Sequence, residues 1–297
     1  MATAPRNQLI SHGAHEPFDL SLYQNRLKFK DKLVLSLEDE NELLLELSSF
    51  EWGRFLLLNK GLNGYWTAYA ILNGLKKEGL CRLERWMLNR APVIKATQER
   101  YLIFKNILQT YVKHDIKFLS VPCGLMDDLL SLDYTAVEHY TLVGIDLDQH
   151  SLDLAFDNSV RHDPHHVSFI RKNAWHLECN NEYDLITSNG LNIYEPDDQK
   201  VIGLYQQFYH ALKPGGVLIT SFLTPSPQAS SESSWVNYNA KDVLKQKAIF
   251  TDIIEVNWQV FRTEHQTHEQ LEAAGFCVYD IIYDSQGMFP TVVAKKL

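Results

Sequence analysis

Short apolar runs alternate with helical stretches over the C-terminal part of the chain, and this alternation constrains the fold more than any other feature. Five such runs follow one another, at residues 118–121, 141–145, 167–170, 183–186 and 217–222. Buried parallel strands have this composition, and their alternation with helices is typical of βαβ units. Two last apolar runs, 276–283 and 291–294, flank the turn sequence Asp284-Ser285-Gln286-Gly287 and predict an antiparallel hairpin. We therefore expect residues 116–297 to form an α/β domain with a doubly wound, mostly parallel sheet.

Residues 1–115 show helical patterns and almost no strand pattern. Apolar residues recur densely over 43–58, after an acidic run at 38–42, and predict one buried helix that ends near Gly61. Further helices are expected at residues 65–75, 83–88 and 93–112, the last with Pro92 in its first turn. We expect this region to form a substrate-binding cap, with apolar faces that pack on the sheet or on a second subunit of a homodimer.

Composition excludes several classes of function. The 297 residues carry a formal net charge of −9, which repels phosphate backbones and disfavours nucleic-acid partners. No run approaches the roughly 18 apolar residues of a membrane span, and residues 1–16 lack the apolar segment of a signal peptide. We expect a cytoplasmic protein with a small-molecule substrate.

The cysteine and histidine patterns do not predict a metal site. The four cysteines are far apart and form no Cys-x-x-Cys pair, so reduced thiols are expected at Cys81, Cys123, Cys179 and Cys277. The histidine-rich segment 162–166 has no companion cluster and predicts an exposed turn.

The turn after the first strand, Ser120-Val121-Pro122-Cys123-Gly124-Leu125-Met126, is the candidate cofactor loop. Ligands of doubly wound sheets bind at the carboxyl ends of the strands, and the first turn comes closest to the cofactor. Gly124 lets the backbone approach a ligand because it has no Cβ. A plain structural turn is the alternative for this one glycine.

An acid closes the second strand. Asp146, followed by Leu147, comes twenty-two residues after Gly124. A carboxylate at this spacing is placed to accept the hydroxyls of a ribose. The alternative is that Asp146 caps the next helix through Ser151.

Polar residues also follow the next two strands. Asn173, Ala174 and Trp175 can meet an adenine through an amide and an apolar face; the alternative is a polar turn with an anchoring tryptophan. Small residues that follow the fourth strand are expected near the reacting centre, and they are Ser188, Asn189 and Gly190.

The order and spacing of these features resemble class I S-adenosylmethionine-dependent methyltransferases, which have a Rossmann-like sheet. The turn Leu212-Lys213-Pro214-Gly215-Gly216 and the closing hairpin are the most specific parts of the likeness. The resemblance implies S-adenosylmethionine (SAM) as cofactor and S-adenosylhomocysteine as product. The implied contacts are Ser120, Pro122, Cys123 and Gly124 with the methionine part, Asp146 and Leu147 with the ribose, Asn173, Ala174 and Trp175 with the adenine, and Ser188, Asn189 and Gly190 near the sulfonium.

The loop departs from the family pattern. The family usually has an acid at the position of Ser120 and glycines at those of Pro122 and Met126. Pro122 has no N–H to donate, so the loop must run differently, and the methionine amine lacks its usual carboxylate.

A narrower likeness concerns the acceptor. Segments 119–124 and 188–191, with Tyr194 and residues 258–264, resemble bacterial methyltransferases that esterify 3-hydroxy fatty acids as quorum-sensing signals. A carboxylate acceptor needs an orienting cation, for which Arg262 is the candidate. A hydroxyl acceptor needs a base, for which Tyr194, His265 or His268 are candidates; the alternative for each is a solvated helix residue.

Three open points remain from the sequence. Residues 61–67 are expected to form a lid over the acceptor, or else a simple turn between helices. A nicotinamide-dependent oxidoreductase fits the glycine turn and the ribose acid equally well. A catalytically silent binding or scaffold protein fits the altered loop residues Ser120, Pro122 and Met126.

Overall fold

A computed structural model describes residues 18–162 and 166–297. The expected absence of a signal peptide in residues 1–16 lies outside these ranges, as does the centre of the expected exposed turn at 162–166. Within the described ranges, no helix is long and apolar enough to cross a membrane.

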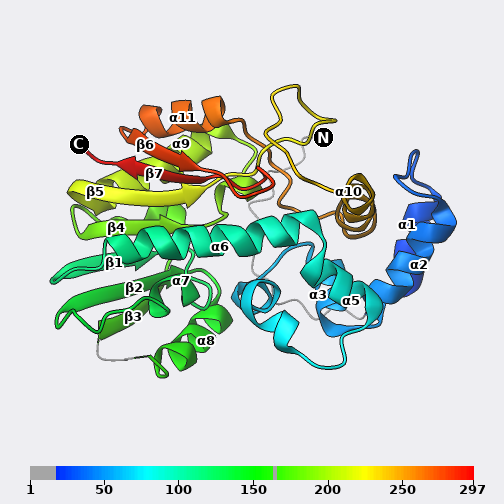
Figure 1. The fold of residues 1–297 in the computed structure, drawn as a ribbon, viewed down its shortest axis with the longest axis horizontal. Helices are drawn as coiled ribbons and strands as arrows, with labels where there is room; N and C mark the ends of the chain where they lie inside the picture. The colour runs from blue at the N-terminus through cyan, green and yellow to red at the C-terminus, as the bar shows by residue number, and fades with distance from the viewer. Residues whose placement is uncertain (1–17, 163–165) are drawn as a thin grey trace, which may run out of the picture.

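One seven-stranded sheet, on the left of Figure 1, forms the centre of the α/β part of the molecule. Its strands are β1 (Ile116–Ser120), β2 (Tyr140–Asp146), β3 (Val167–Arg171), β4 (Tyr183–Ser188), β5 (Leu212–Ser221), β6 (Cys277–Ile282) and β7 (Thr291–Lys295). Their order is β3-β2-β1-β4-β5-β7-β6, with β1 to β5 parallel and β7 antiparallel to both of its neighbours. The mostly parallel sheet and its antiparallel C-terminal hairpin, both predicted from the apolar runs, are confirmed.

Helices cover both faces of the sheet. Neighbouring strand residues point to opposite faces, so Phe118 packs in one core cluster and Leu119 in the other. One face carries α6 (Pro92–Thr110), α7 (Asp127–Leu130) and α8 (Gln149–Ser159), and the other carries α9 (Asp198–Ala211) and α11 (Glu264–Ala273). The strand order reverses between β1 and β4, and the carboxyl ends of strands at such a point form the ligand crevice.

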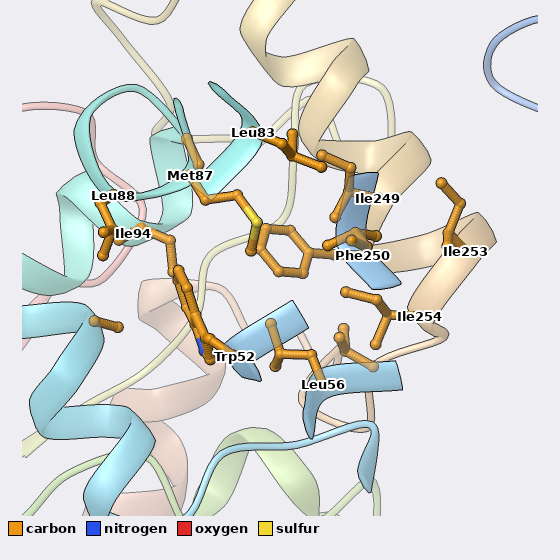
Figure 2. Close-up of a cluster of buried hydrophobic side chains, with 14 of the residues drawn as sticks. Trp52, Leu56, Leu83, Met87, Leu88, Ile94, Ile249, Phe250, Ile253 and Ile254 are labelled. Carbon is orange, nitrogen blue, oxygen red and sulfur yellow. The ribbon is translucent and has the colours of Figure 1, made fainter. Parts of the chain in front are cut away.

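A helical cap adjoins the sheet on the right of Figure 1. Its elements are α1 (Leu20–Lys28), α2 (Leu37–Ser48), α3 (Glu51–Asn59), α4 (Gly64–Ala68), the π-helix η1 (Tyr69–Asn73), the 3-10 turn η2 (Gly74–Lys76) and α5 (Arg82–Asn89), joined by α10 (Ala240–Lys247) and the π-helix η6 (Ala248–Ile254). In its core, Trp52 and Met87 from the N-terminal helices pack with Phe250 from η6 (Figure 2). The cap is therefore built from both parts of the chain, and its main apolar faces are buried within one subunit.

The single helix predicted over residues 43–58 is two helices, α2 and α3. Gly53 lies so close to the end of α2 that a Cβ there would be 2.0 Å from the Leu47 carbonyl oxygen. This close approach lets α3 turn back against α2, so both helices bury apolar residues in the same core. The helix predicted over 65–75 is also divided, into α4 and the turns η1 and η2.

Candidate active site

The loop after β1 is tied to the ends of the two strands beside it. The Val121 amide donates to the Thr187 carbonyl of β4 at 2.9 Å, and the Cys123 amide donates to the Ile145 carbonyl of β2 at 2.8 Å. The Val121–Pro122 peptide bond is cis, and Gly124 has φ +51°, a conformation that favours glycine. The two backbone hydrogen bonds hold the loop against the ends of β2 and β4, at the point where the strand order reverses.

Asp146 holds this loop from the end of β2. Its Oδ2 accepts the Gly124 amide at 3.0 Å, and its Oδ1 accepts the Asp148 amide at 3.0 Å. Asp148, and not Asp146, caps α8, with hydrogen bonds to the His150 amide at 3.2 Å and the Ser151 hydroxyl at 2.8 Å. Burial raises the pKa of Asp146. Asp148 therefore provides the helix cap that was considered for Asp146, and the Asp146 carboxylate binds the loop after β1 instead.

A second carboxylate, Asp128 of α7, lies at the other side of the loop. Its Oδ2 is 3.3 Å from the Ser120 hydroxyl and 3.1 Å from the Thr187 hydroxyl, and its Oδ1 accepts the Leu129 amide at 3.0 Å. Burial raises its pKa to about 6. Sequence reasoning missed Asp128, although the Asp-Asp pair directly after the loop was a signal for it. The following helix thus brings a carboxylate beside Ser120, the position at which the family usually has an acid.

Asn173, Ala174 and Trp175, the residues expected at the adenine, lie in the segment that follows β3. Asn173 uses its Oδ1 to accept the Trp175 amide at 3.0 Å, and it thereby begins the turn η4 (Ala174–His176). In the part of the chain that the structure describes, the buried Trp175 Nε1 has no hydrogen-bond partner. The carbonyl of Leu147, which follows β2, accepts a hydrogen bond from the Arg171 Nε at 3.1 Å.

The residues after β4 are linked to the end of β5. Asn189 Oδ1 accepts the Ser221 hydroxyl at 3.0 Å, Ser188 is buried, and Gly190 has φ +90°. Tyr194, in η5 (Asn192–Tyr194), makes a hydrogen bond with the backbone of Leu62, and burial raises its pKa to about 12. A phenol with this pKa is protonated at neutral pH, which disfavours it as a general base.

Arg262 uses its guanidinium within the protein. Its Nε and Nη2 donate to Asp198 at 3.1 and 2.9 Å, its Nη1 donates to the Asn192 carbonyl at 2.8 Å, and its Nη2 also donates to the Glu195 carbonyl at 2.8 Å. The side chain is only 3% exposed. These contacts fix η5 to the start of α9, so they favour a positioning role for Arg262 over direct binding of an acceptor.

The two candidate histidines lie on α11, the helix packed on the face of the sheet opposite α6. The side chain of His265 is 80% exposed and lies beside Glu269, and that of His268 is 41% exposed and lies beside Glu272. Both pairs have the i,i+4 spacing of a solvated helix surface. No hydrogen bond in the described residues joins either histidine to the cofactor loop, and this arrangement favours the alternative of solvated residues.

The cap reaches the cofactor loop through Gly64, the first residue of α4. A Cβ on Gly64 would lie 2.8 Å from the Gly124 Cα and 2.9 Å from the Ser151 Oγ. The Gly64 amide also donates to that hydroxyl at 3.2 Å. The segment 61–67, expected as a lid, therefore lies directly on the loop.

Comparisons with known proteins identify the family. Residues 113–275 match the family model described as "Methyltransferase domain". A search of curated proteins finds no match. A solved structure described as a "possible exported protein" from Bordetella parapertussis is 41% identical, with 93% of this chain and 94% of that chain covered and a TM-score of 0.90.

More distant structures are similar in fold. The pyocyanin biosynthetic protein PhzM is 20% identical over 82% of this chain and 64% of its own, with a TM-score of 0.52. A SAM-dependent methyltransferase from Methanosarcina mazei is 16% identical over 64% of this chain and 97% of its own, with a TM-score of 0.48. The comparisons give no support to the narrower likeness to enzymes that esterify 3-hydroxy fatty acids, nor to a nicotinamide-dependent oxidoreductase.

The family model covers more than half of the chain and includes all five parallel strands, from β1 to β5, together with the loops at their carboxyl ends. The chain therefore belongs to the methyltransferase domain family and is a SAM-dependent methyltransferase.

Proposed function

We propose that the chain transfers a methyl group from SAM to an oxygen of a small-molecule acceptor, a carboxylate or a hydroxyl. The observation that carries this proposal is the pair of carboxylates, Asp128 and Asp146, on the two sides of the loop that follows β1. A cofactor with a ribose diol and a positively charged methionine part fits two acids placed in this way. The close approach of Gly64 and Gly124 leaves no room for a Cβ between cap and loop.

Each part of the cofactor has residues that suit it. Asp146 would hold the ribose hydroxyls, and Asp128 with Ser120 would hold the methionine ammonium. Asn173 and Trp175, which follow β3, would contact the adenine, since each has a side-chain N–H that can donate a hydrogen bond. We further propose the remaining contacts expected from the sequence, which are Pro122, Cys123 and Gly124 in the loop, Leu147 after β2, Ala174 after β3, and Ser188, Asn189 and Gly190 after β4.

The protein contributes mainly alignment and the exclusion of water. When bound, SAM supplies a methyl carbon that is activated by the positive sulfur, so an acceptor oxygen can displace the sulfur in line. The cap segment that begins α4 covers the loop and keeps water from the reacting groups. Arg262 holds η5, and with it Tyr194, in place beside the ends of β4 and β5.

Calorimetric titration with S-adenosylhomocysteine tests the cofactor assignment. Asp146→Asn should weaken binding about 10- to 100-fold, since a hydrogen bond to a charged group is worth roughly 1.5–3 kcal/mol. Asp128→Asn should weaken it by a similar factor. Asp157→Asn, at an exposed position on α8, is the matched control and should bind like the wild type. Wild-type protein that binds no S-adenosylhomocysteine would refute the proposal.

Turnover separates a working enzyme from a silent binding protein. Purified protein is incubated with SAM and one member at a time of a panel of organic acids, phenols and amines. We expect S-adenosylhomocysteine to form with the oxygen acceptors. If the protein binds S-adenosylhomocysteine but forms none of it from SAM with any acceptor, the scaffold interpretation is favoured.

We also propose that the enzyme works in the cytoplasm, because its four cysteines are unpaired. The similar Bordetella protein is described as possibly exported, so fractionation of cells that express the chain is the direct test. A homodimer stays a prediction, which light scattering at several protein concentrations would check.

A further inference from the structure

Two buried arginines differ in what surrounds their charge. Arg262 is 3% exposed and has an acid and two carbonyls as partners. Arg100, in the middle of α6, is 6% exposed and makes one hydrogen bond, from its Nη1 to the Ser221 hydroxyl at 3.3 Å. Its Nε is buried without a partner, and no carboxylate among residues 18–162 and 166–297 lies within ion-pair distance of it. Arg100 is therefore a buried cation that has no ion-pair partner in the described ranges.

Asp284 is the acid that interacts electrostatically with Arg100, but its oxygens already accept hydrogen bonds from backbone amides. Asp284 accepts the Gln286 amide at 3.0 Å and the Phe289 amide at 2.6 Å. The Arg100 guanidinium instead lies over the Phe289 ring, 4.5 Å from its centroid. Burial lowers the pKa of Arg100 to about 10. A buried charge without an ion-pair partner is costly, and such groups gather at functional sites.

Arg100 lies at the carboxyl ends of two neighbouring strands of the sheet. Ser221 is the last residue of β5, and its hydroxyl donates to Asn189, directly after β4. Tyr194 is close enough for its phenol to interact electrostatically with Arg100. These groups mark the carboxyl ends of β4 and β5. Strand β4 lies beside β1, whose carboxyl end leads into the cofactor loop.

We propose that Arg100 binds the carboxylate of the methyl acceptor, so that the substrate is a small organic acid. The planar guanidinium pairs with a carboxylate through two parallel hydrogen bonds, and the free Nε can serve as one of the two donors. The ring of Phe289, against which the guanidinium lies, gives the acceptor an apolar surface beside its acid group. This inference rests on the proposed function and names the substrate class for the same site.

Thermal unfolding and calorimetry with matched probes test the inference. Benzoate and octanoate are compared with benzamide and octanamide, which have the same apolar parts without the charge. The wild type should bind the two acids in preference to the amides. Arg100→Met should weaken binding of the acids about 10- to 100-fold, the loss expected for hydrogen bonds to a charged group, and Arg100→Lys should keep only part of the affinity.

The stability of the ligand-free protein separates a binding role from a structural one. Arg100→Met removes a buried charge that has no ion-pair partner among the described residues, and it should unfold at the same or a higher temperature than the wild type. Arg262→Met is the matched control, because it breaks three partnerships of a buried arginine and should unfold at a lower temperature. Arg100→Met that unfolds at a lower temperature would overturn the inference, whatever it binds.

Two other results would also overturn it. One is wild-type protein that does not distinguish the acids from the amides at millimolar concentration, and the other is Arg100→Met that binds the acids like the wild type. Titration with S-adenosylhomocysteine in the same samples keeps the two proposals apart. If the wild type binds S-adenosylhomocysteine but not the acids, only the role of Arg100 fails; if it binds neither, the proposed function fails.

Discussion

The contact between the cap and the cofactor loop leads to a prediction at Gly64. In Gly64→Ala the new Cβ would lie 2.8 Å from the Gly124 Cα and 3.0 Å from the Gly124 carbonyl carbon. Both are backbone atoms of the loop that Asp146 holds, so no side chain can turn away to relieve the clash. Either α4 or the loop must move by several tenths of an ångström.

The size of the effect follows from the same distances. Overpacking of this kind costs about 1–3 kcal/mol, and alanine regains up to roughly 1 kcal/mol over glycine in a helix. We expect the free energy of unfolding to fall by about 1–2 kcal/mol. If the loop moves, the affinity for S-adenosylhomocysteine should fall about tenfold, since 1.4 kcal/mol corresponds to a factor of ten.

Urea denaturation and calorimetry with S-adenosylhomocysteine measure the two quantities. Gly203→Ala is the matched control, because no described atom outside its own helix backbone and chain neighbours lies within 4 Å of the new Cβ in α9. This control should be slightly more stable than the wild type and should bind the ligand equally well. Gly64→Ala with wild-type stability and wild-type affinity would refute the close packing of the cap on the loop.

Three further predictions concern residues of the cap and of the candidate site. Glu40 is buried beside Asp252, and burial raises its pKa from 4.5 to about 7. Its stabilising effect is fully present below about pH 4.5 and is lost as the pH rises through about 7. In thermal unfolding, Glu40→Gln should therefore lose less stability than the wild type between these pH values. Trp52→Ala empties the core of the cap and should lower the free energy of unfolding by about 3–5 kcal/mol in urea denaturation. Tyr194→Phe should keep kcat near that of the wild type between pH 7 and 9, because its phenol has a pKa of about 12; a large loss of kcat would restore it as a proton acceptor.

The fold was predictable because its signals are local in the chain. Each strand from β1 to β5 is a short apolar run bounded by turn residues, and the hairpin of β6 and β7 surrounds a recognisable turn. The candidate cofactor loop was found in the same way, from one glycine after one strand and one acid after the next. The division between α2 and α3 was not found, because it depends on the contact of Gly53 with a carbonyl of the preceding helix.

The chemistry of the site was less predictable, because it depends on which side chains meet across the sheet. Ser120 occupies the position at which the family usually has an acid. Only the folded chain brings Asp128 beside Ser120 and beside Thr187, which is 59 residues after Asp128. Arg262 was the expected cation, yet its partners lie 64 to 70 residues away and occupy its guanidinium. The sequence by itself determined the sheet, the family resemblance and the loop, since periodicity and turn residues are read along the chain. The tertiary structure alone decided that, within the described part of the chain, Arg262 has an ion-pair partner and Arg100 has none, since a charge is neutralised by its neighbours in space.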